Sequence, residues 1–321
     1  MIRWRHGKTV SDTDNFLEES LPDDHRSGFV AVVGRPNVGK STLINAILGQ
    51  KIAIVTPRPQ TTQRQQLGIY TEPQMQIIFV DTPGLHNPQH KLGEFMVKVA
   101  EDALRDADVV LWVLDISVEP TVADKHIADT IQQVQDTPVI LALNKADLLD
   151  DANAEAHIAA YQELVPHDLA MLVSALNNDG VSNLIGVLAE RLPEGPRFYP
   201  PDQVSEVNMR FIAAEVIREK IMLATEQEIP HSVAVEIVEY KERSETMTYI
   251  SAIIYVERDS QKGIIIGKGG SMIKKLGQDA RAELEPMLDT QVYLDLQVKV
   301  LKNWRSDDRL MRRLGYRIAR D

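Results

Sequence analysis

The sequence predicts a protein of the α/β class, in which a doubly wound, mostly parallel sheet is followed by a smaller α+β domain. Three observations predict it. An apolar run at 29–33 leads into the glycine-rich loop Gly34-Arg35-Pro36-Asn37-Val38-Gly39-Lys40-Ser41, strand and helix patterns then alternate up to residue 192, and a proline-rich segment at 193–204 ends the alternation. Alternating strands and helices form a parallel sheet that binds its ligand at the carboxyl ends of the strands.

Length, composition and charge limit the class of protein. The 321 residues include no cysteine, which excludes disulfides and thiolate metal centres, and a chain of this length usually forms two domains. The longest apolar runs fall far short of the ~20 residues that cross a bilayer, so a cytoplasmic protein is expected. A net charge of −12 argues against a nucleic-acid partner, but residues 262–321 carry thirteen basic and eight acidic side chains and keep a local basic face.

The elements of the first domain, residues 28–192, follow from apolar runs and helical spacing. Residues 1–27 are polar, with no apolar period, and predict a flexible extension. Residues 56–64 are polar and broken by prolines, and predict a functional loop. Strands are expected at 29–33, 75–80, 109–114, 139–143 and 170–173, and helices at 42–48, 92–104, 122–134, 154–164 and 181–192.

The loop at 34–41 has the G-x-x-x-x-G-K-S pattern of a phosphate-binding loop. Gly34 and Gly39 permit a close approach of phosphate, the Lys40 ammonium reaches the β and γ oxygens, and the Ser41 hydroxyl suits Mg²⁺. The same octapeptide could arise by chance in a turn, but the flanking strand and helix favour a nucleotide site. The residues expected to contact the nucleotide here are Gly34, Asn37, Val38, Gly39, Lys40, Ser41 and Thr42.

A second cluster, Asp81-Thr82-Pro83-Gly84, follows the strand expected at 75–80. The Asp81 carboxylate can reach Mg²⁺ through water, and the Gly84 N–H can reach a γ-phosphate. Taken singly, an aspartate after a strand is usually a turn residue or a helix cap. Its place after the phosphate loop, at a strand end, favours a part in the same site.

Two further clusters end the later strands. In Asn144-Lys145-Ala146-Asp147, the last carboxylate can accept two hydrogen bonds from the N1–H and N2–H₂ edge of guanine, whereas adenine presents an acceptor there and would leave the charge unpaired. Ser174-Ala175-Leu176 could offer a backbone N–H to guanine O6. The residues expected to contact the nucleotide beyond the phosphate loop are Asp81, Asn144, Lys145, Asp147, Ser174 and Ala175.

Five short motifs, in their order along about 29–192, resemble the five sequence boxes of the translation-factor-related GTPases. They are GRPNVGKS, the QTT segment at 60–62, DTPG, NKAD and SAL. The resemblance implies Mg²⁺-dependent hydrolysis of GTP to GDP, with Lys40, Thr62 and Gly84 in catalytic roles. One position departs from the pattern of Ras. Leu85 follows DTPG, where Ras-like enzymes carry a glutamine that orients the attacking water, so slow intrinsic turnover is expected.

The same resemblance implies the metal ligands. Mg²⁺ would be held by Ser41, Thr62 and Asp81, and Thr61 is the alternative to Thr62. Asn37 matches the loop asparagine that binds a monovalent cation in potassium-dependent members of the family, which implies K⁺ as a further cofactor.

Beyond the linker expected at 193–204, the second domain, residues 205–303, follows a different order. The expected elements are a helix at 211–221, strands at 233–237 and 250–256 around a turn at 241–245, the loop Gly267-Lys268-Gly269-Gly270 after three isoleucines at 264–266, a helix at 271–288 and a strand at 292–300. This order and the Gly-Lys-Gly-Gly loop resemble the bacterial type II KH domain.

The KH resemblance implies that single-stranded RNA approaches the glycine loop while apolar neighbours form the floor for its bases. The alternative is a plain glycine turn that joins a short strand to a helix. The preceding isoleucines and the nearby lysines favour RNA. The residues expected to bind it are Ile266, Gly267, Lys268, Gly269, Gly270, Lys274 and Lys275.

One GTPase domain followed by one KH domain resembles the Era family of bacterial ribosome-assembly GTPases. The resemblance implies binding to small-subunit ribosomal RNA near its 3′ end, a role in assembly of the small ribosomal subunit, and peripheral association with the inner face of the cell membrane; a monomer is expected. The basic tail at 304–321 has arginines at helical spacing, which suit a solvated helix face as well as an RNA or lipid contact. Leu85 leaves a rival hypothesis, an RNA-binding assembly factor whose nucleotide domain has a structural role only.

Overall fold

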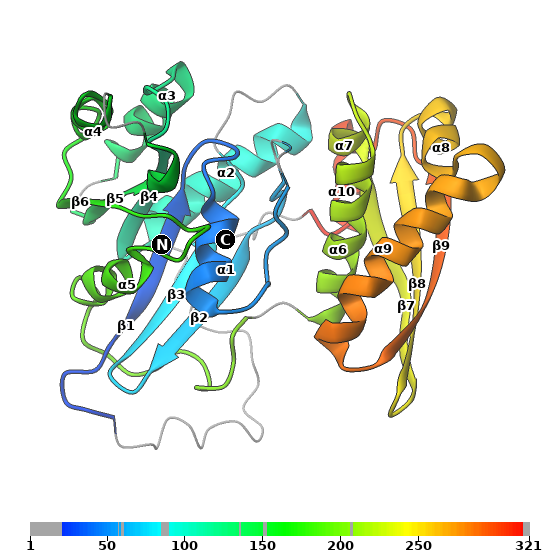
Figure 1. Cartoon of the computed structure of the whole chain (residues 1–321), viewed down its shortest axis with the longest axis horizontal. Helices are drawn as coiled ribbons and strands as arrows, with labels where there is room; N and C mark the ends of the chain where they lie inside the picture. The colour runs from blue at the N-terminus through cyan, green and yellow to red at the C-terminus, as the bar shows by residue number, and fades with distance from the viewer. Residues whose placement is uncertain are drawn as a thin grey trace.

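A computed structural model of the chain describes residues 21–56, 58, 61–84, 90–134, 136–149, 153–205 and 208–316. Within these residues the chain forms two domains side by side, one around a six-stranded sheet and one around a three-stranded sheet (Figure 1). The predicted fold class is confirmed. Of the extension expected at 1–27, residues 1–20 lie outside the described residues, and Arg26 and Ser27 already belong to the first strand.

The first sheet is mostly parallel, with strand order β2-β3-β1-β4-β5-β6. Only β2 runs antiparallel, beside β3 at the edge. The central strands are buried along their whole length or nearly so, as strands covered by helices on both faces must be. The strands are β1 Arg26–Val33, β2 Gln66–Glu72, β3 Met75–Asp81, β4 Val109–Asp115, β5 Val139–Asn144 and β6 Leu169–Leu172.

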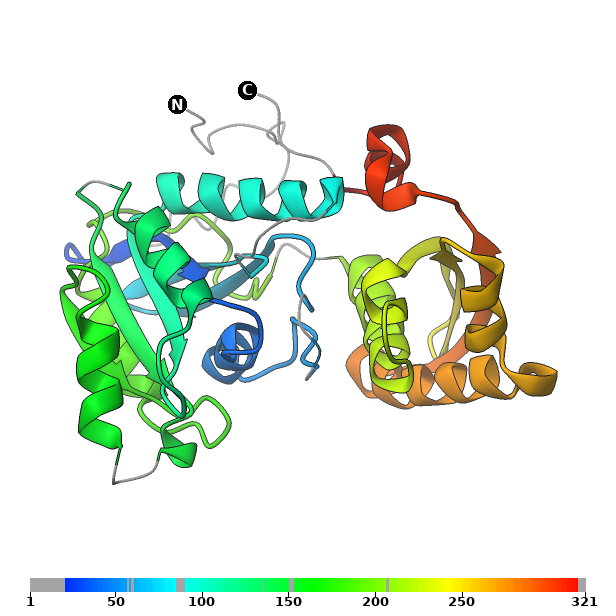
Figure 2. The same ribbon diagram turned by 90° about the horizontal axis from the view of Figure 1, so that it is seen from above.

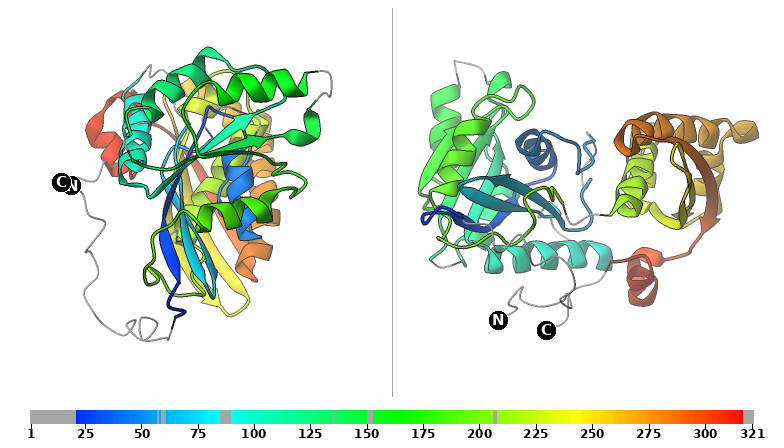
Figure 3. Two further views of the ribbon diagram at one scale, coloured as in Figure 1. Left: turned by 90° about the vertical axis from the view of Figure 1, so that its left-hand side faces the viewer. Right: turned by 90° about the horizontal axis from the view of Figure 1, so that it is seen from below.

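Helices cover both faces of this sheet (Figures 2 and 3). Buried residues of α1 and α5 pack in one core cluster with one face, and buried residues of α2, α3 and α4 pack in a second cluster with the other face. The helices are α1 Lys40–Leu48, α2 Lys91–Asp106, α3 Val122–Ile131, α4 Ala154–Gln162 and α5 Val181–Ala189, with a 3₁₀ turn, η2, at Ala146–Leu148. The carboxyl ends of the strands and the start of α1 therefore meet at one edge.

Strand β2 was not predicted. It lies at the edge of the sheet and contains polar residues and Gly68, so it lacks the continuous apolar run of the buried strands. A Cβ on Gly68 would lie 2.8 Å from Leu48 Cδ1, so the glycine lets α1 pack closely against the strand. The apolar residues of β2 that are buried, Leu67 and Ile69, alternate with Gly68 and are too few to signal a strand.

The second domain has the order helix, two strands, two helices, strand, with short helices added. Its sheet order is β7-β8-β9, with β8 antiparallel to β7 and parallel to β9, and α6 and α9 share one apolar core with this sheet. The main elements are α6 Met209–Ala224, α7 Ile229–Ser232, β7 Ala234–Ser244, β8 Met247–Val256, α8 Asp259–Ile266, α9 Ser271–Leu288 and β9 Gln291–Val300. The 3₁₀ turns η3 Lys268–Gly270 and η4 Trp304–Ser306 and the helix α10 Asp308–Arg313 complete it.

One expectation for this domain was wrong, and one helix was missed. The turn expected at 241–245 is still strand: Lys241 pairs with Tyr249 and Ser244 pairs with Met247, so the hairpin turns at 245–246. The isoleucines at 264–266 end a helix, α8, that the sequence did not predict. Three β-branched residues in a row favour a strand locally, but Ile265 is fully buried in the core of the domain, and packing decides.

The segment expected as a linker, 193–204, is bonded along the first domain. Ser27 donates its N–H to the Pro193 carbonyl (3.0 Å), and Ile69 donates to the Val204 carbonyl (2.7 Å). Between them, the Gln76 side chain accepts hydrogen bonds from the N–H groups of residues 198 and 199 (2.7 and 2.9 Å). The connection between the domains is thus a strap held by its backbone.

An apolar cluster also joins the two domains. Helix α2 extends from the first domain to α10 (Figure 2), and its side chains share an apolar cluster with η4, α10 and the face of the second sheet opposite α6 and α9. The cluster consists of Leu92, Phe95, Met96, Val99, Ala234, Ile253, Tyr255, Trp304, Met311, Leu314 and Tyr316. None of the helices in the described part of the chain is long and apolar enough to cross a membrane.

Candidate nucleotide site and nucleic-acid interface

The phosphate loop joins β1 to α1 in a conformation that requires glycine at two positions. Gly34 has a φ of 152° and Gly39 a φ of 100°. A Cβ on Gly34 would lie 2.4 Å from the Val113 carbonyl oxygen, and one on Gly39 would lie 2.3 Å from Asn144 Nδ2. Among the described residues no side chain caps the start of α1, which leaves its first N–H groups to water or a ligand.

Two buried charges face this loop. The Lys40 Nζ donates to the carbonyls of Gly34 (2.9 Å) and Arg35 (3.1 Å). Burial lowers the pKa of Lys40 to about 8, although the nearby Asp81 opposes the shift. Burial likewise raises the pKa of Asp81 to about 6, against the attraction of Lys40. Both shifts show that burial costs each charge free energy, which a phosphate beside the ammonium and a cation beside the carboxylate would offset.

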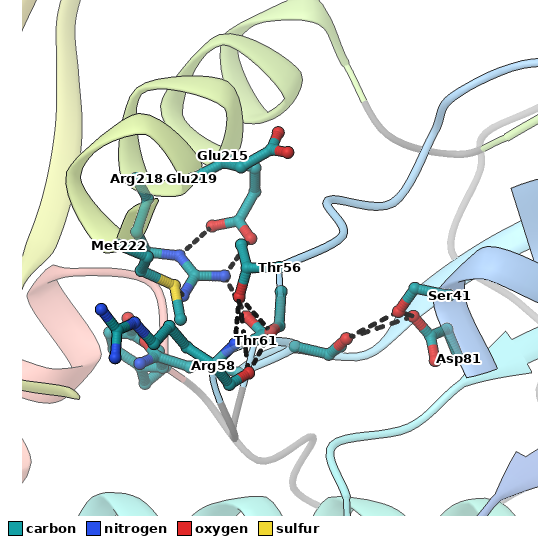
Figure 4. Close-up of polar contacts among 12 residues, drawn as sticks. Ser41, Thr56, Arg58, Thr61, Asp81, Glu215, Arg218, Glu219 and Met222 are labelled. Atoms are coloured by element: carbon teal, nitrogen blue, oxygen red, sulfur yellow. Dashed lines mark hydrogen bonds and ion pairs between the residues drawn. The ribbon is translucent and has the colours of Figure 1, made fainter. Parts of the chain in front are cut away.

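The hydroxyls of Ser41 and Thr62 converge on Asp81. Ser41 Oγ donates to Asp81 Oδ2 (3.0 Å), Thr62 Oγ1 donates to the same oxygen (3.3 Å), and the two hydroxyl oxygens lie 3.2 Å apart. Figure 4 shows Ser41 and Asp81 pointing toward each other. Asp81 Oδ1 is buried and has no hydrogen-bond partner among the described residues. Converging oxygens and one unsatisfied carboxylate oxygen fit a hard cation such as Mg²⁺.

The neighbouring threonine faces elsewhere. Thr61 Oγ1 donates to the Arg58 carbonyl (2.8 Å) and lies 2.9 Å from Thr56 Oγ1. Gly84 is buried against the phosphate loop, where a Cβ would lie 3.1 Å from the Pro36 nitrogen. The geometry therefore brings the hydroxyl of Thr62 and the backbone of Gly84, but not the hydroxyl of Thr61, to the phosphate loop.

The two remaining clusters meet behind the loop. Ser174 Oγ donates to Asp147 Oδ1 (2.5 Å), and Asp147 is exposed. Asn144 Nδ2 donates to the Val38 carbonyl (2.7 Å), and Asn144 Oδ1 accepts the N–H of Ala175 (3.0 Å). The buried Asn144 thus connects the phosphate loop to the Ser174 segment, while the exposed carboxylate of Asp147 can face a base.

A partly buried network of charged side chains supports these clusters, and the sequence analysis missed two of its members, Asp115 and Asp124. Lys145 Nζ lies 2.6 Å and Arg35 Nη2 3.5 Å from Asp115 Oδ2, and Arg35 Nε lies 3.2 Å from the buried carboxylate of Asp124. Burial alone would raise the pKa of Asp115, but hydrogen bonds from Lys145 and Ser117 outweigh it and lower the pKa. The signal was present in the sequence, because Asp115 ends β4 as Asp81 ends β3.

The glycine loop of the second domain lies between α8 and α9. Gly267 has a φ of 73°, and a Cβ there would lie 2.7 Å from Met272 Cβ, so this position must be glycine. Gly269 and Gly270 also have positive φ, of 60° and 80°, but they face open space. Lysines 268, 274 and 275 are all exposed. Ile266 is partly buried in the core, whereas Ile264, which the sequence analysis did not select, is 51% exposed.

Comparisons with known proteins match each of the two domains. Residues 29–145 match the family model described as 50S ribosome-binding GTPase, and residues 228–305 match the KH domain model. GTPase Era of Ruminiclostridium cellulolyticum is 44% identical over 293 residues, which cover 91% of this chain and 98% of that protein. The chain belongs to the Era family of GTPases. GTPase Era of Thermotoga maritima is 50% identical over 284 residues, 88% of this chain and 94% of that protein.

Solved structures of Era resemble the chain over nearly its whole length. One is Era in complex with MgGDPNP and nucleotides 1506–1542 of 16S ribosomal RNA; it is 37% identical, with a TM-score of 0.85, and the match covers 92% of this chain and all of that one. Another is a variant of Aquifex aeolicus Era bound to GDP·AlF₄⁻, which is 38% identical, with a TM-score of 0.86 and coverage of 91% and 100%. The solved Era structures therefore match this chain across both its GTPase domain and its KH domain. As a member of this family of GTPases, the chain is an enzyme that hydrolyses GTP.

In this Era-family chain the fold gathers the predicted nucleotide residues at one edge of the first sheet. Asn37, exposed and with a left-handed φ of 66°, and Thr42, in the first turn of α1, complete the phosphate loop. The predicted RNA residues lie together in the KH domain, around η3 and the start of α9. Leu85 lies outside the described residues.

Proposed function

We propose that this Era-family GTPase is a GTP-dependent switch that binds small-subunit ribosomal RNA near its 3′ end and acts in assembly of the small ribosomal subunit. One observation carries the proposal: the chain joins the site of Ser41, Thr62 and Asp81 to an exposed Gly-Lys-Gly-Gly loop. The same two-domain arrangement occurs in the Era structure that holds MgGDPNP and a 16S ribosomal RNA segment.

The phosphates of GTP would lie on the N–H groups at the start of α1, with Lys40 beside the β and γ oxygens. Ser41 and Thr62 hydroxyls and, through water, Asp81 would hold Mg²⁺, which when bound neutralises charge on the phosphate oxygens. The position of its hydroxyl favours Thr62 over Thr61 for this role. Asn37 would contribute to a monovalent cation site.

The base would be read by Asp147, whose carboxylate accepts two hydrogen bonds from guanine. Ser174 holds one oxygen of that carboxylate and so fixes its direction. The backbone of Ala175 is held by Asn144, which places the segment that would face guanine O6. Lys145 would pack beside the base. Its partner Asp115 also pairs with Arg35 and so would help to hold the phosphate loop in place.

Hydrolysis would depend on positioning and charge. Lys40 and the Gly84 N–H would stabilise charge on the transferred phosphoryl group. Leu85 offers no group to orient water, so slow turnover is expected without a partner. Membership of the Era family of GTPases argues against a nucleotide domain with a structural role only.

RNA would bind at the glycine loop of the KH domain. The exposed lysines 268, 274 and 275 supply charge for the RNA backbone, and Gly269 and Gly270 leave open space for it. Ile266 and the exposed Ile264 would form the apolar floor for bases. The α9 helix begins at Ser271 without a side-chain cap among the described residues, which favours a phosphate there.

The place of action would be the cytoplasm, with peripheral contact to the inner face of the membrane. The family resemblance and the exposed Arg309 and Arg313 of α10 support this part of the proposal. Fractionation of cells in low and high salt tests it, because an electrostatic contact weakens as salt rises. If the same fraction of the protein is released from membranes at both salt concentrations, the contact is not electrostatic.

The direct experiment measures phosphate release by the full-length chain with and without an oligonucleotide of 16S ribosomal RNA nucleotides 1506–1542. Filter binding with the same oligonucleotide, and with one of the same composition in scrambled order, measures affinity. We expect tighter binding of the natural sequence with a GTP analogue than with GDP. Equal binding of both oligonucleotides would remove the assignment to the 3′ end.

A further inference from the structure

A buried arginine of the KH domain contacts the GTPase domain. Arg218 on α6 is only 1% exposed. Its Nε donates to Glu215 Oε1 (2.9 Å), its Nη2 donates to Glu215 Oε2 (2.5 Å), and its Nη1 donates to Met222 Sδ (3.2 Å). A buried guanidinium needs partners for its donors, and Glu215 supplies both the charge and the direction. The guanidinium group is therefore fixed in place by its own helix.

The remaining contact of Arg218 crosses to the other domain. Its Nη2 also donates to the main-chain carbonyl of Thr61, as Figure 4 shows. The next residue is Thr62, whose hydroxyl lies 3.3 Å from Asp81 Oδ2 and 3.2 Å from Ser41 Oγ. Only one peptide unit thus separates a side chain of the KH domain from the group that faces the metal position.

Other contacts join the chain between α1 and β2 to α6 and to its C-terminal cap. Arg58 Nη2 donates to the Thr225 carbonyl (3.1 Å), and Lys51 Nζ pairs with Glu219 (2.7 Å). All three contacts involve a charged donor, but the side chains of Lys51 and Arg58 are partly exposed, whereas Arg218 is buried and its contact is shielded from water. Because it acts on a main-chain carbonyl, Arg218 responds to where the backbone of residues 61 and 62 lies.

We propose that Arg218 is a positioning residue for the nucleotide site: by holding the Thr61 carbonyl it keeps Thr62 at the metal position and links nucleotide state to the KH domain. The inference rests on the metal role proposed above for Thr62. When Thr62 turns away, the Thr61 carbonyl moves and Arg218 loses a buried acceptor. By linkage, a nucleotide that holds Thr62 in place also favours this arrangement of the KH domain, and the reverse holds equally.

The first test replaces Arg218 with methionine in the full-length chain. Arg218→Met should lower the preference for a non-hydrolysable GTP analogue with Mg²⁺ over GDP by about 10-fold, within the usual range of coupling between sites, while affinity for GDP stays the same. The ratio of RNA affinities in the two nucleotide states, measured with the 1506–1542 oligonucleotide, should fall toward one. Arg210→Met is the matched control, since Arg210 is exposed on the same helix and contacts Tyr240.

Further variants separate positioning from charge pairing. Arg218→Met leaves Glu215 without its cation, so the double variant with Glu215→Gln removes that charge as well. If the defect comes from the unpaired carboxylate, the double variant regains the preference for the GTP analogue, and that result would overturn the proposal. A defect caused by the lost Thr61 contact persists there, and Arg218→Lys, which can still donate to the carbonyl, restores part of the preference.

Two measurements decide the remaining outcomes. If the Thr62→Ala protein still prefers the GTP analogue in the presence of Mg²⁺, the proposed metal role of Thr62 fails. If Thr62→Ala removes this preference but Arg218→Met does not, only the Arg218 proposal fails. Hydrogen exchange of the unmodified protein needs no variant. Replacing GDP by the GTP analogue should slow exchange at 61–64 and at 215–222 together, and slowing at 61–64 alone would overturn the proposal.

Discussion

Ser174 donates a 2.5 Å hydrogen bond to Asp147, so that the ends of two different strands direct one carboxylate. Asp147→Asn should replace an acceptor by a donor and shift preference from GTP toward xanthosine triphosphate, whose base offers the complementary acceptor. Loss of two hydrogen bonds to a charged group, each worth about 1.5–3 kcal/mol, predicts at least a ~100-fold loss of GTP affinity. Competition binding of the two nucleotides measures it, with Asp129→Asn on α3 as control. An unchanged preference for guanine would mean that another residue reads the base.

Lys40→Ala should weaken binding of GTP by roughly 100-fold, since it removes charge-assisted hydrogen bonds to the β and γ oxygens. The KH domain should stay folded, because the hydrogen bonds of Lys40 to the described residues lie within the phosphate loop. Titration with a fluorescent GTP analogue measures affinity, and circular dichroism checks the fold. Lys98→Ala, an exposed lysine on α2, serves as control. Hydrolysis at the parental rate in Lys40→Ala would refute the phosphate-loop assignment.

The RNA loop can be altered without damage to its fold at two positions. Lys268 is exposed and Gly269 faces open space, and aspartate tolerates the left-handed conformation of Gly269 better than most residues. Lys268→Asp with Gly269→Asp places carboxylates beside the RNA phosphates, so RNA affinity should fall at least ~10-fold while basal GTP hydrolysis persists. Gly267 is unsuitable, since a side chain there would strike Met272.

Filter binding and phosphate release on one preparation test both halves of this prediction. Lys125→Asp, which reverses a charge on α3 of the GTPase domain, is the matched control. Retained RNA affinity in the folded double variant would place the RNA contact elsewhere on the molecule.

The contact between the domains should depend on pH through Glu283 on α9. Burial would raise the pKa of Glu283, but hydrogen bonds from Lys220 and Lys51 outweigh it and hold the pKa below its ordinary 4.5. A folded-state pKa below the unfolded value means that the carboxylate stabilises the fold above pH 4.5 and that this stability is lost as the pH falls further. In Glu283→Gln the unfolding temperature should therefore fall less between about pH 5 and about pH 3.5. Parallel melting curves of the two proteins across that range would contradict it.

Local patterns in the sequence carried much of the fold and of the nucleotide site. Strands β4 and β5 could be predicted because buried parallel strands are continuous apolar runs, and Lys40 and Asp147 because their chemistry is tied to short motifs. The edge strand β2 and helix α8 could not, since their residues are set by neighbours distant in sequence rather than by a period. The contact of Arg218 with Thr61 spans 157 residues, and no local pattern marks it.

The strap at 193–204, together with Ser205, lies along the GTPase domain and belongs to its fold. Strand β2 is the outermost strand of its sheet, and its free side is met by the carbonyl of Val204 and by a bridge between Gly68 and Ser205. In a fragment that ends at residue 192, where the last helical pattern of the domain stops, the N–H and C=O groups on the outer side of β2 would be exposed and could pair with another chain. A fragment that retains residue 205 keeps this cover, and should remain in solution at concentrations where the shorter one aggregates.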